Sequence, residues 1–207
     1  MTLIKLIRAA LPLIFLMTAD AAPVTFTYLV NTGGINGTAG YLDFQFNAGS
    51  IFSQPATATI SEFSTAGGAL TAPSINTGSA SGSLPGNVTL GNNAAFNDTF
   101  QPFTFGSTFR FTITLSGPAL DTPAGSGSGT AFGLSLYGAD AVTPLLTLDP
   151  NGTILVLQLN PNGTTQASSA SVVSAVAVPE PASWVLLIGA ALAFALSRRL
   201  LNASSLN

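Results

Sequence analysis

The chain has 207 residues, with neither cysteine nor histidine, and only 6% of them are charged. These absences exclude thiol and imidazole catalysis, disulfide bonds and the usual zinc sites. Between residues 23 and 177, Arg110 is the only cation beside six carboxylates. A body with this excess of negative charge would repel phosphate backbones, so we expect no nucleic acid partner.

Residues 1–22 have the layout of a secretory signal peptide. Lys5 and Arg8 provide a positive start, and an apolar stretch follows at residues 9–17. An uncleaved anchor is the alternative, but the apolar stretch is short for a membrane span and Pro12 interrupts it. We therefore predict export across the inner membrane followed by cleavage. Signal cleavage requires alternating small residues, and the candidates are Ala19, Ala21 and Ala22.

Residues 23–165 form the body, and its dominant pattern is the alternation of apolar and polar residues that marks half-buried strands. In the clearest run, Phe109, Phe111, Ile113 and Leu115 would share one face of a strand. The last run of the body is more continuously apolar, which predicts a central strand covered on both faces. The other runs lie at residues 24–30, 41–46, 56–63, 132–136 and, last, 154–159.

Turn-forming Gly, Asn and Pro residues separate these runs, and no part of the body combines a helical period with helix caps. Short strands at this spacing are typical of an all-β fold, an antiparallel β-sandwich or jelly roll. We predict eight to ten strands in two antiparallel sheets, with most phenylalanine side chains between them. Burying one such side chain contributes about 1.5–3 kcal/mol, so this core can hold the domain without disulfide bonds.

Residues 166–177 consist almost entirely of Ser, Ala and Val, without a charged or aromatic residue. The favoured interpretation is a linker, because a membrane tail needs a spacer from the folded body. The alternative is an edge strand that uses the valines of this segment.

Residues 178–199 form a targeting segment. Its sixteen central residues, 182–197, carry no charge. As a helix they would extend about 24 Å, against a hydrocarbon core of about 30 Å, which predicts one short transmembrane helix. Arg198 and Arg199 form a basic stop that marks the cytoplasmic side, so the body would lie on the outer side. The prolines before the helix favour an extended backbone, and this element is Val178, Pro179, Glu180 and Pro181.

This tail resembles the PEP-CTERM sorting signal of Gram-negative bacteria, in which Pro-Glu-Pro precedes a short apolar span and a double arginine. The resemblance implies processing near the Pro-Glu-Pro by an exosortase, a membrane-embedded cysteine protease. The protein would be anchored only transiently and then pass to the cell surface or the exopolysaccharide matrix. Residues 200–207 depart from the pattern, because such signals usually end soon after the arginines. The body also resembles the β-rich region of one group of these proteins, in segments 40–47, 56–60, 111–120, 135–137 and 143–147. This resemblance suggests placement rather than activity.

The body offers little chemistry for catalysis or metal binding. A catalytic carboxylate pair needs two acids in one cleft, whereas Asp43 is predicted on the polar face of a strand and Asp98 in or near a turn. Asp140 and Asp149 could contribute to a calcium site, but their spacing matches no known loop, and turn aspartates usually bond their own backbone. Arg110, on a polar strand face, is expected to pair with an acid. We predict no catalytic residue, metal or cofactor.

The leading functional hypothesis is therefore a non-enzymatic secreted protein of the cell surface or exopolysaccharide matrix, sorted by its tail. The alternative is a carbohydrate-binding module on the same β-sandwich, which requires an exposed aromatic platform or a polar groove. Tyr41 and Tyr137 are the main aromatic residues expected to point outward. A hydrolase is a third possibility, and it requires a cleft with two acids within about 10 Å.

Overall fold

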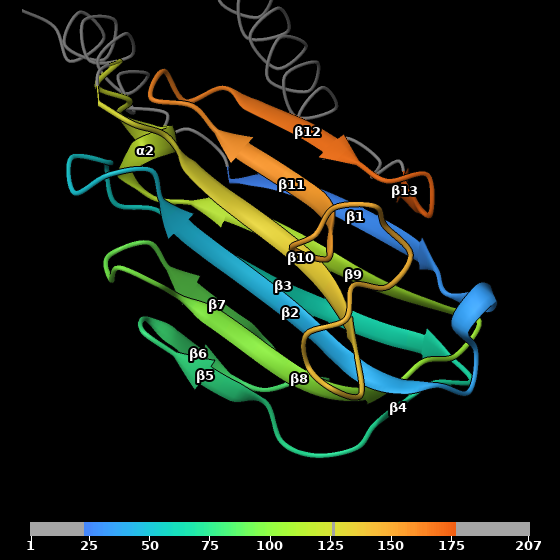
Figure 1. Ribbon diagram of the computed structural model, residues 1–207. Coiled ribbons are helices and arrows are strands. Elements are labelled where there is room, and N and C mark those ends of the chain that lie inside the picture. Colours follow the sequence, from blue (N-terminus) through green and yellow to red (C-terminus); the bar gives the residue numbers. More distant parts are fainter. Residues whose placement is uncertain (1–22, 126, 177–207) are drawn as a thin grey trace, which may run out of the picture. The chain divides into compact units, whose positions relative to one another are not determined.

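The computed structural model describes residues 23–125 and 127–176 (Figure 1). The predicted signal peptide 1–22, with its cleavage residues, and the tail 177–207, with the Pro-Glu-Pro element, the predicted transmembrane helix and Arg198-Arg199, lie outside these residues. Among the helices of the described part, none is long and apolar enough to cross a membrane.

Two antiparallel sheets stack face to face, as the strand pattern predicts (Figure 1). The β1 sheet contains, in spatial order, β13 (Val173–Val176), β1 (Val24–Asn31), β9 (Thr108–Ser116), β3 (Thr57–Ala66), β7 (Val88–Gly91) and β6 (Ala80–Gly82). The β2 sheet contains β12 (Thr165–Ser169), β11 (Thr153–Leu159), β10 (Thr130–Gly138), β2 (Ala39–Ala48), β8 (Asp98–Thr104) and β4 (Ala69–Leu70), and β5 (Ile75–Thr77) also pairs with β8.

The described residues thus hold 13 strands, more than the eight to ten predicted. The additional strands are short: β4, β5 and β6 have two or three residues each. Too few residues alternate in such segments to give a period. Two short helices, η2 (Gly33–Ile35) and α2 (Pro118–Asp121), occupy connections where only turns were expected. Pro118 suits the first position of α2, because the fixed φ of proline matches a helix start.

The core lies between the sheets and is rich in phenylalanine, as predicted. Phe109 and Phe111 of β9 are fully buried, and so are Phe44 of β2 and Phe132 of β10. The rings of Phe44 and Phe111 meet edge to face across the two sheets, with centroids 5.4 Å apart. Aromatic pairs in this geometry add about 0.5–1.5 kcal/mol to the free energy of burial.

Strand β11 differs from its prediction as a central strand covered on both faces. It is the second strand from the edge of the β2 sheet, between β12 and β10. Its ladder with β10 shifts by one residue, since Leu134 pairs with Leu155 but Ser135 pairs with Thr153. Ile154 is the extra residue of this bulge and is buried beside Leu155. The bulge, rather than a second covering layer, explains the continuous apolar run.

Residues 166–176 contain edge strands, the alternative interpretation of this segment, rather than the favoured linker: β12 and β13 are joined by a turn at residues 170–172. β12 pairs with β11, and β13 pairs with β1 in the other sheet. The alternation in β13 is weak because only Val173 is buried there. An edge strand needs one hydrogen-bonded neighbour and few apolar side chains, so Ser, Ala and Val are sufficient. The folded body therefore ends at Val176 rather than at residue 165.

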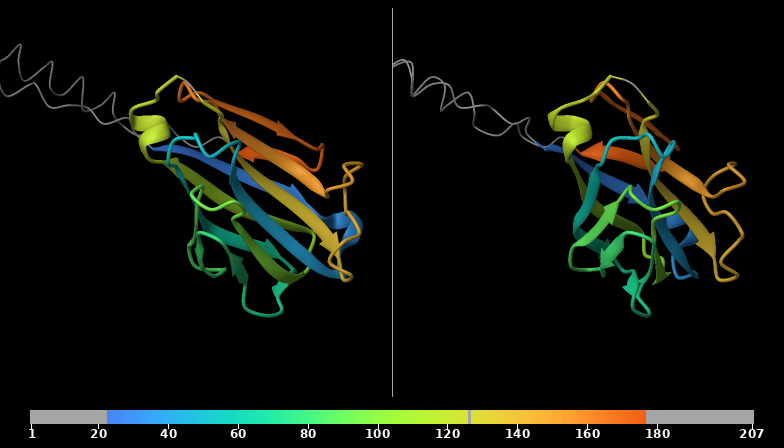
Figure 2. Two further views of the ribbon diagram at one scale, coloured as in Figure 1. Left: turned by 60° about the vertical axis from the view of Figure 1, so that its left-hand side comes forward. Right: turned by 90° about the vertical axis from the view of Figure 1, so that its left-hand side faces the viewer.

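The connections of the sandwich gather at two opposite ends. The end where β1 begins also carries the loops 49–56, 92–97, 117–129 and 160–164, with α2 among them (Figure 2). We call it the exit end, because β13 runs antiparallel to β1 and so points toward it. The loop 139–152 and η2 lie at the opposite end (Figure 1).

Candidate functional site

The outer face of the β2 sheet carries a row of polar and aromatic side chains. Strand β2 turns Leu42, Phe44 and Phe46 toward the core, so its intervening residues face outward. Residues directly opposite each other on neighbouring strands share a face. The outward set on β2, β10 and β8 is therefore Tyr41, Asp43, Gln45, Asn47, Gly133, Ser135, Tyr137, Asp98 and Phe100.

Three of these residues, Tyr41, Phe100 and Tyr137, form an outer aromatic cluster. The rings of Tyr41 and Phe100 stack with centroids 4.5 Å apart, and those of Phe100 and Tyr137 are 6.2 Å apart. All three side chains are half-buried. The Tyr137 hydroxyl donates to the backbone oxygen of Asn151 at 2.6 Å. The prediction that Tyr41 and Tyr137 point outward is confirmed, whereas Phe100 was missed.

Phe100 was missed because β8 reverses the usual pattern, with polar side chains toward the core and an aromatic ring on the outer face. Its core-facing neighbours are polar: Thr99 and Gln101 are fully buried. The Thr99 hydroxyl bonds the Asn76 side chain at 2.9 Å, and the Gln101 amide donates to the Ala72 backbone oxygen at 2.8 Å. These bonds satisfy the buried polar groups, which allows the aromatic ring to face outward. A signal for this arrangement is the Asp-Thr-Phe-Gln-Pro-Phe sequence itself, in which apolar residues do not alternate strictly.

Asp43 lies beneath this surface and is buried, with 5% of its side chain exposed. Its Oδ2 accepts a hydrogen bond from Gln45 Nε2 at 2.6 Å, but its Oδ1 has no partner in the described structure. Burial raises the pKa of Asp43 to about 6; the hydrogen bond from Gln45 opposes this shift, and the charge of Asp98 adds to it. The carboxyl group is thus held where its charged form is poorly stabilised.

Asp98 is the second buried acid; it is the first residue of β8, directly after the loop 92–97 and so near a turn, as predicted. The ladder pairs Asp98 with Gln45, which places it diagonally from Asp43. The structure thus brings together two carboxylates that sequence analysis kept apart. Neither lines the groove described next, so neither meets a substrate there. Within the described ranges, no group of three or more His, Cys, Asp or Glu residues could hold a metal ion.

A shallow groove of about 370 Å³ crosses β2, β10 and β11 beside the aromatic cluster. A Cβ atom on Gly133 would meet no atom within 4 Å, so this glycine leaves the floor of the groove open. Tyr137 and Asn151 stand at one side. We call this feature the outer groove; it is lined by Gln45, Asn47, Ala131, Phe132, Gly133, Ser135, Tyr137, Asn151, Thr153 and Val156, none of which is charged.

The other predicted candidates have local structural roles. Asp140 accepts hydrogen bonds from the backbone and hydroxyl of Thr143 and from the backbone of Val142, and these bonds lower the pKa of Asp140. Asp149 accepts from the Asn151 backbone at 2.8 Å. Both aspartates therefore form turns. Arg110 is exposed on the β1 sheet, and its cross-strand neighbours in the described structure are uncharged, contrary to the expected ion pair.

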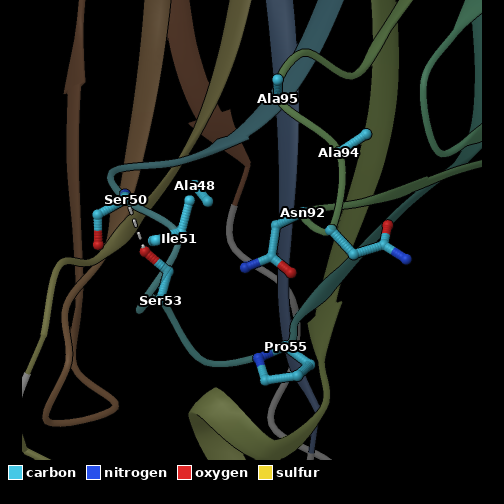
Figure 3. A pocket seen from close by; sticks show the side chains of 9 residues that line it. Ala48, Ser50, Ile51, Ser53, Pro55, Asn92, Ala94 and Ala95 are labelled. Atoms are coloured by element: carbon cyan, nitrogen blue, oxygen red, sulfur yellow. Dashed lines mark hydrogen bonds between the residues drawn. The ribbon is translucent and has the colours of Figure 1, made fainter.

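A second hollow, of about 470 Å³, opens at the exit end between the loops 49–56 and 92–97 (Figure 3). Asn92 points into the gap between these loops and holds them together. Its Nδ2 donates to the Gln54 backbone oxygen and to the Thr130 hydroxyl, both at 2.8 Å, and its Oδ1 accepts from the Ala56 backbone. The lining of this hollow is uncharged and contains no group suited to acid–base chemistry.

Comparison with known proteins finds a match in the C-terminal segment, outside the folded body. Residues 177–199 match the family described as the PEP-CTERM protein-sorting motif. The chain carries a PEP-CTERM sorting signal. The predicted Pro-Glu-Pro element and Arg198-Arg199 fall within the matched residues, and the signal implies export and processing by an exosortase. No curated protein and no solved structure matches the chain.

Proposed function

We propose that this protein is a non-enzymatic component of the cell surface or exopolysaccharide matrix, released there by exosortase cleavage near Glu180. The observation that carries this proposal is the PEP-CTERM signal at residues 177–199, directly after a folded domain that ends at Val176. The uncharged stretch 182–197 would hold the precursor in the membrane until cleavage. Because only 6% of the chain is charged, most of its polar side chains are the hydroxyls and amides of Ser, Thr, Asn and Gln, which suit a hydrated polysaccharide environment.

We propose a non-enzymatic role because of the ionisable side chains that the body contains and where they lie. Without cysteine or histidine, its acid–base groups are mainly carboxylates. Asp43 and Asp98 are buried under the sheet surface, and Asp140 and Asp149 are engaged in turns. A general acid or base must reach the proton that it transfers, and none of these four groups is placed to do so.

Mass spectrometry of the mature protein in its native host tests the sorting proposal. Material recovered from the surface or matrix should end near residues 178–181. An intact tail containing Arg198 and Arg199 in that material would contradict processing. Deletion of the host exosortase should retain the full tail in the membrane fraction, which separates processing by this enzyme from nonspecific proteolysis.

The outer groove favours a second function, binding of a neutral polysaccharide. Its amide and hydroxyl side chains supply donors and acceptors for sugar hydroxyls, and Tyr137 offers an aromatic wall. Pockets for uncharged polar ligands combine such apolar surface with a few polar groups. The lack of charged residues in the lining argues against an anionic ligand.

A glycan array followed by titration with the best ligand tests this second function. Gly133→Leu should fill the groove and weaken binding at least tenfold, because the backbone of Gly133 has no positive φ and its Cβ direction is open. Tyr137→Ala should weaken binding as well. Ser64→Leu, at an exposed position of β3 in the other sheet, is the matched control. If the unaltered protein binds no glycan, or Gly133→Leu binds as well as Ser64→Leu, the groove is not a glycan site.

A further inference from the structure

The exit end of the body exposes three large apolar side chains in two adjacent loops. Ile51 is 93% exposed, Phe52 77% and Phe96 47%. Their loops, 49–56 and 92–97, flank the hollow closed by Asn92. Ile51 also lines this hollow, and none of the three side chains belongs to the hydrophobic core cluster. Large apolar side chains gathered at one end indicate a contact surface.

The register of β13 and the short connection after it limit how far the uncharged stretch can be from the exit end. Val176 pairs with Thr27, three residues before the end of the sheet at Val24, which is about 10 Å at 3.3 Å per residue. Five residues lie between Val176 and Ala182, where the uncharged stretch begins, and the six Cα–Cα steps from Val176 to Ala182 reach at most about 20 Å. The chain that leads to the uncharged stretch can therefore reach at most about 10 Å past the sheet end.

The apolar loops project into this short interval. Thr57 pairs with Ser116, and Val24 pairs with Leu115, so β3 begins at nearly the same level as β1. Residues 49–56 precede β3 and therefore lie at the exit end, beyond the first residue of β3 (Figure 2). The headgroup layer is about 5–8 Å thick on each side. A body tied this closely cannot stand clear of the membrane while β13 remains paired.

The charges of the exit end are compatible with a lipid surface. Among its loops 49–56, 92–97, 117–129 and 160–164, Asp121 is the only charged residue in the sequence. Anionic headgroups therefore meet little repulsion, and the apolar side chains supply the attraction, as in other interfacial segments. The opposite end also exposes Val142 and Leu148, but it lies a full strand length away from the exit end, where β13 ends.

We infer that, before cleavage, the exit end rests on the outer surface of the inner membrane, with Ile51 and Phe52 inserted among the lipid headgroups. This inference rests on the proposed membrane hold by residues 182–197. Its consequence is that the body is oriented on the membrane by two attachments, the chain itself and the apolar loops, so the Pro-Glu-Pro element is held at the lipid surface.

Fluorescence quenching in vesicles tests this inference with the full chain. The sequence has no cysteine, so single substitutions Phe52→Cys, Phe96→Cys, Leu148→Cys and Leu186→Cys each accept one environment-sensitive dye. The proteins are reconstituted into vesicles of phosphatidylethanolamine and phosphatidylglycerol that contain acyl-chain quenchers. Dyes at Phe52 and Phe96 should be quenched at least fivefold more strongly than the dye at Leu148, which is fully exposed at the opposite end.

The dye at Leu186 tests the membrane hold separately from the loop contact. If it is quenched while the dye at Phe52 behaves like that at Leu148, the loop contact is wrong and the membrane hold stands. If the dye at Leu186 is not quenched, both fail. A blue shift at Phe52 without lipid quenching would assign the loops to contact between two copies of the protein and would overturn the inference.

Discussion

Asp43 and Asp98 are diagonal neighbours on the adjacent strands β2 and β8, and each has one buried carboxylate oxygen without a hydrogen-bond partner in the described part of the chain. Diagonal Cβ atoms in an antiparallel pair are about 7 Å apart. Each negative charge therefore opposes the other in a site that water does not solvate. Burial of the Asp43 carboxylate, to which the charge of Asp98 adds, weakens the fold at neutral pH and gives stability a pH dependence that can be measured.

Asp43→Asn should stabilise the body at neutral pH. The folded pKa of Asp43 is about 6, above the ordinary value of 3.8, so the folded state holds its proton longer than the unfolded state. Stability must then fall as pH rises from about 4 to about 6, and this cost is complete above pH 6. The variant should gain up to about 3 kcal/mol at pH 7.5 and less than about 1 kcal/mol at pH 4.

Urea denaturation of the variant and the unaltered protein at both pH values measures this difference. Asp121→Asn removes an exposed carboxylate and is the control for net charge. An equal gain in Asp121→Asn, or a gain in Asp43→Asn that does not change with pH, would contradict the assignment to burial of Asp43.

Asn92→Ala should destabilise the exit end. The side chain makes three hydrogen bonds, to Ala56, Gln54 and Thr130, and is buried. Its removal leaves buried backbone groups unsatisfied, with an expected loss of about 2–4 kcal/mol in the free energy of unfolding. Thermal and urea unfolding measure the loss. Asn93→Ala, at the exposed neighbour, should change stability by less than about 0.5 kcal/mol; equal losses in both variants would refute the role of Asn92.

Ser174→Pro should detach β13 from β1. The Asn31 backbone donates to Val172, and hydrogen-bonded pairs alternate along an antiparallel ladder, so the Ser174 N–H points toward Leu29. Proline removes this donor. Amide hydrogen exchange in residues 173–176 should accelerate at least tenfold. Ser171→Pro is the control, because Ser171 occupies the second position of the turn closed by Val173 and Ala170, where proline is favoured.

Glu180→Ala should block sorting without changing the fold of the body. Glu180 lies in the sorting signal and outside the described residues of the body, which end at Val176. The measurement compares the surface and membrane fractions of the native host by immunoblot, with circular dichroism of the purified variant as a test of folding. Loss of Arg198 and Arg199 should have the same effect. Normal surface delivery of either variant would remove the basis of the proposed function.

The sheets were predictable where one strand face is apolar and the other polar. Phe109, Phe111 and Ile113 alternate with polar residues, and such a run buries its apolar face in only one register. Strand β8 was not predicted in this way because Thr99 and Gln101 face the core, where hydrogen bonds satisfy their polar groups. Strand β13 escaped it because an edge strand can be held by backbone hydrogen bonds and one buried valine, without a repeating apolar face.

The outer groove and the acid pair were not predictable from periodicity. Alternation placed Tyr41, Asp43 and Tyr137 on outward faces, but it does not specify which strands are neighbours. The order β10-β2-β8 brings together segments about 60 and 90 residues apart along the chain, and only this order sets Asp43 beside both Ser135 and Phe100. Sequence motifs, by contrast, located the sorting signal well because its elements are contiguous.

The pairing of β13 with β1 sets an order of events during export. β1 is among the first parts of the body to cross the membrane, yet one of its edges stays open until residues 173–176 have followed. The sorting signal begins at residue 177, so the last strand and the signal emerge almost together. A protease acting on the signal at that moment would therefore meet a body whose last strand has only just become available to close the sheet edge.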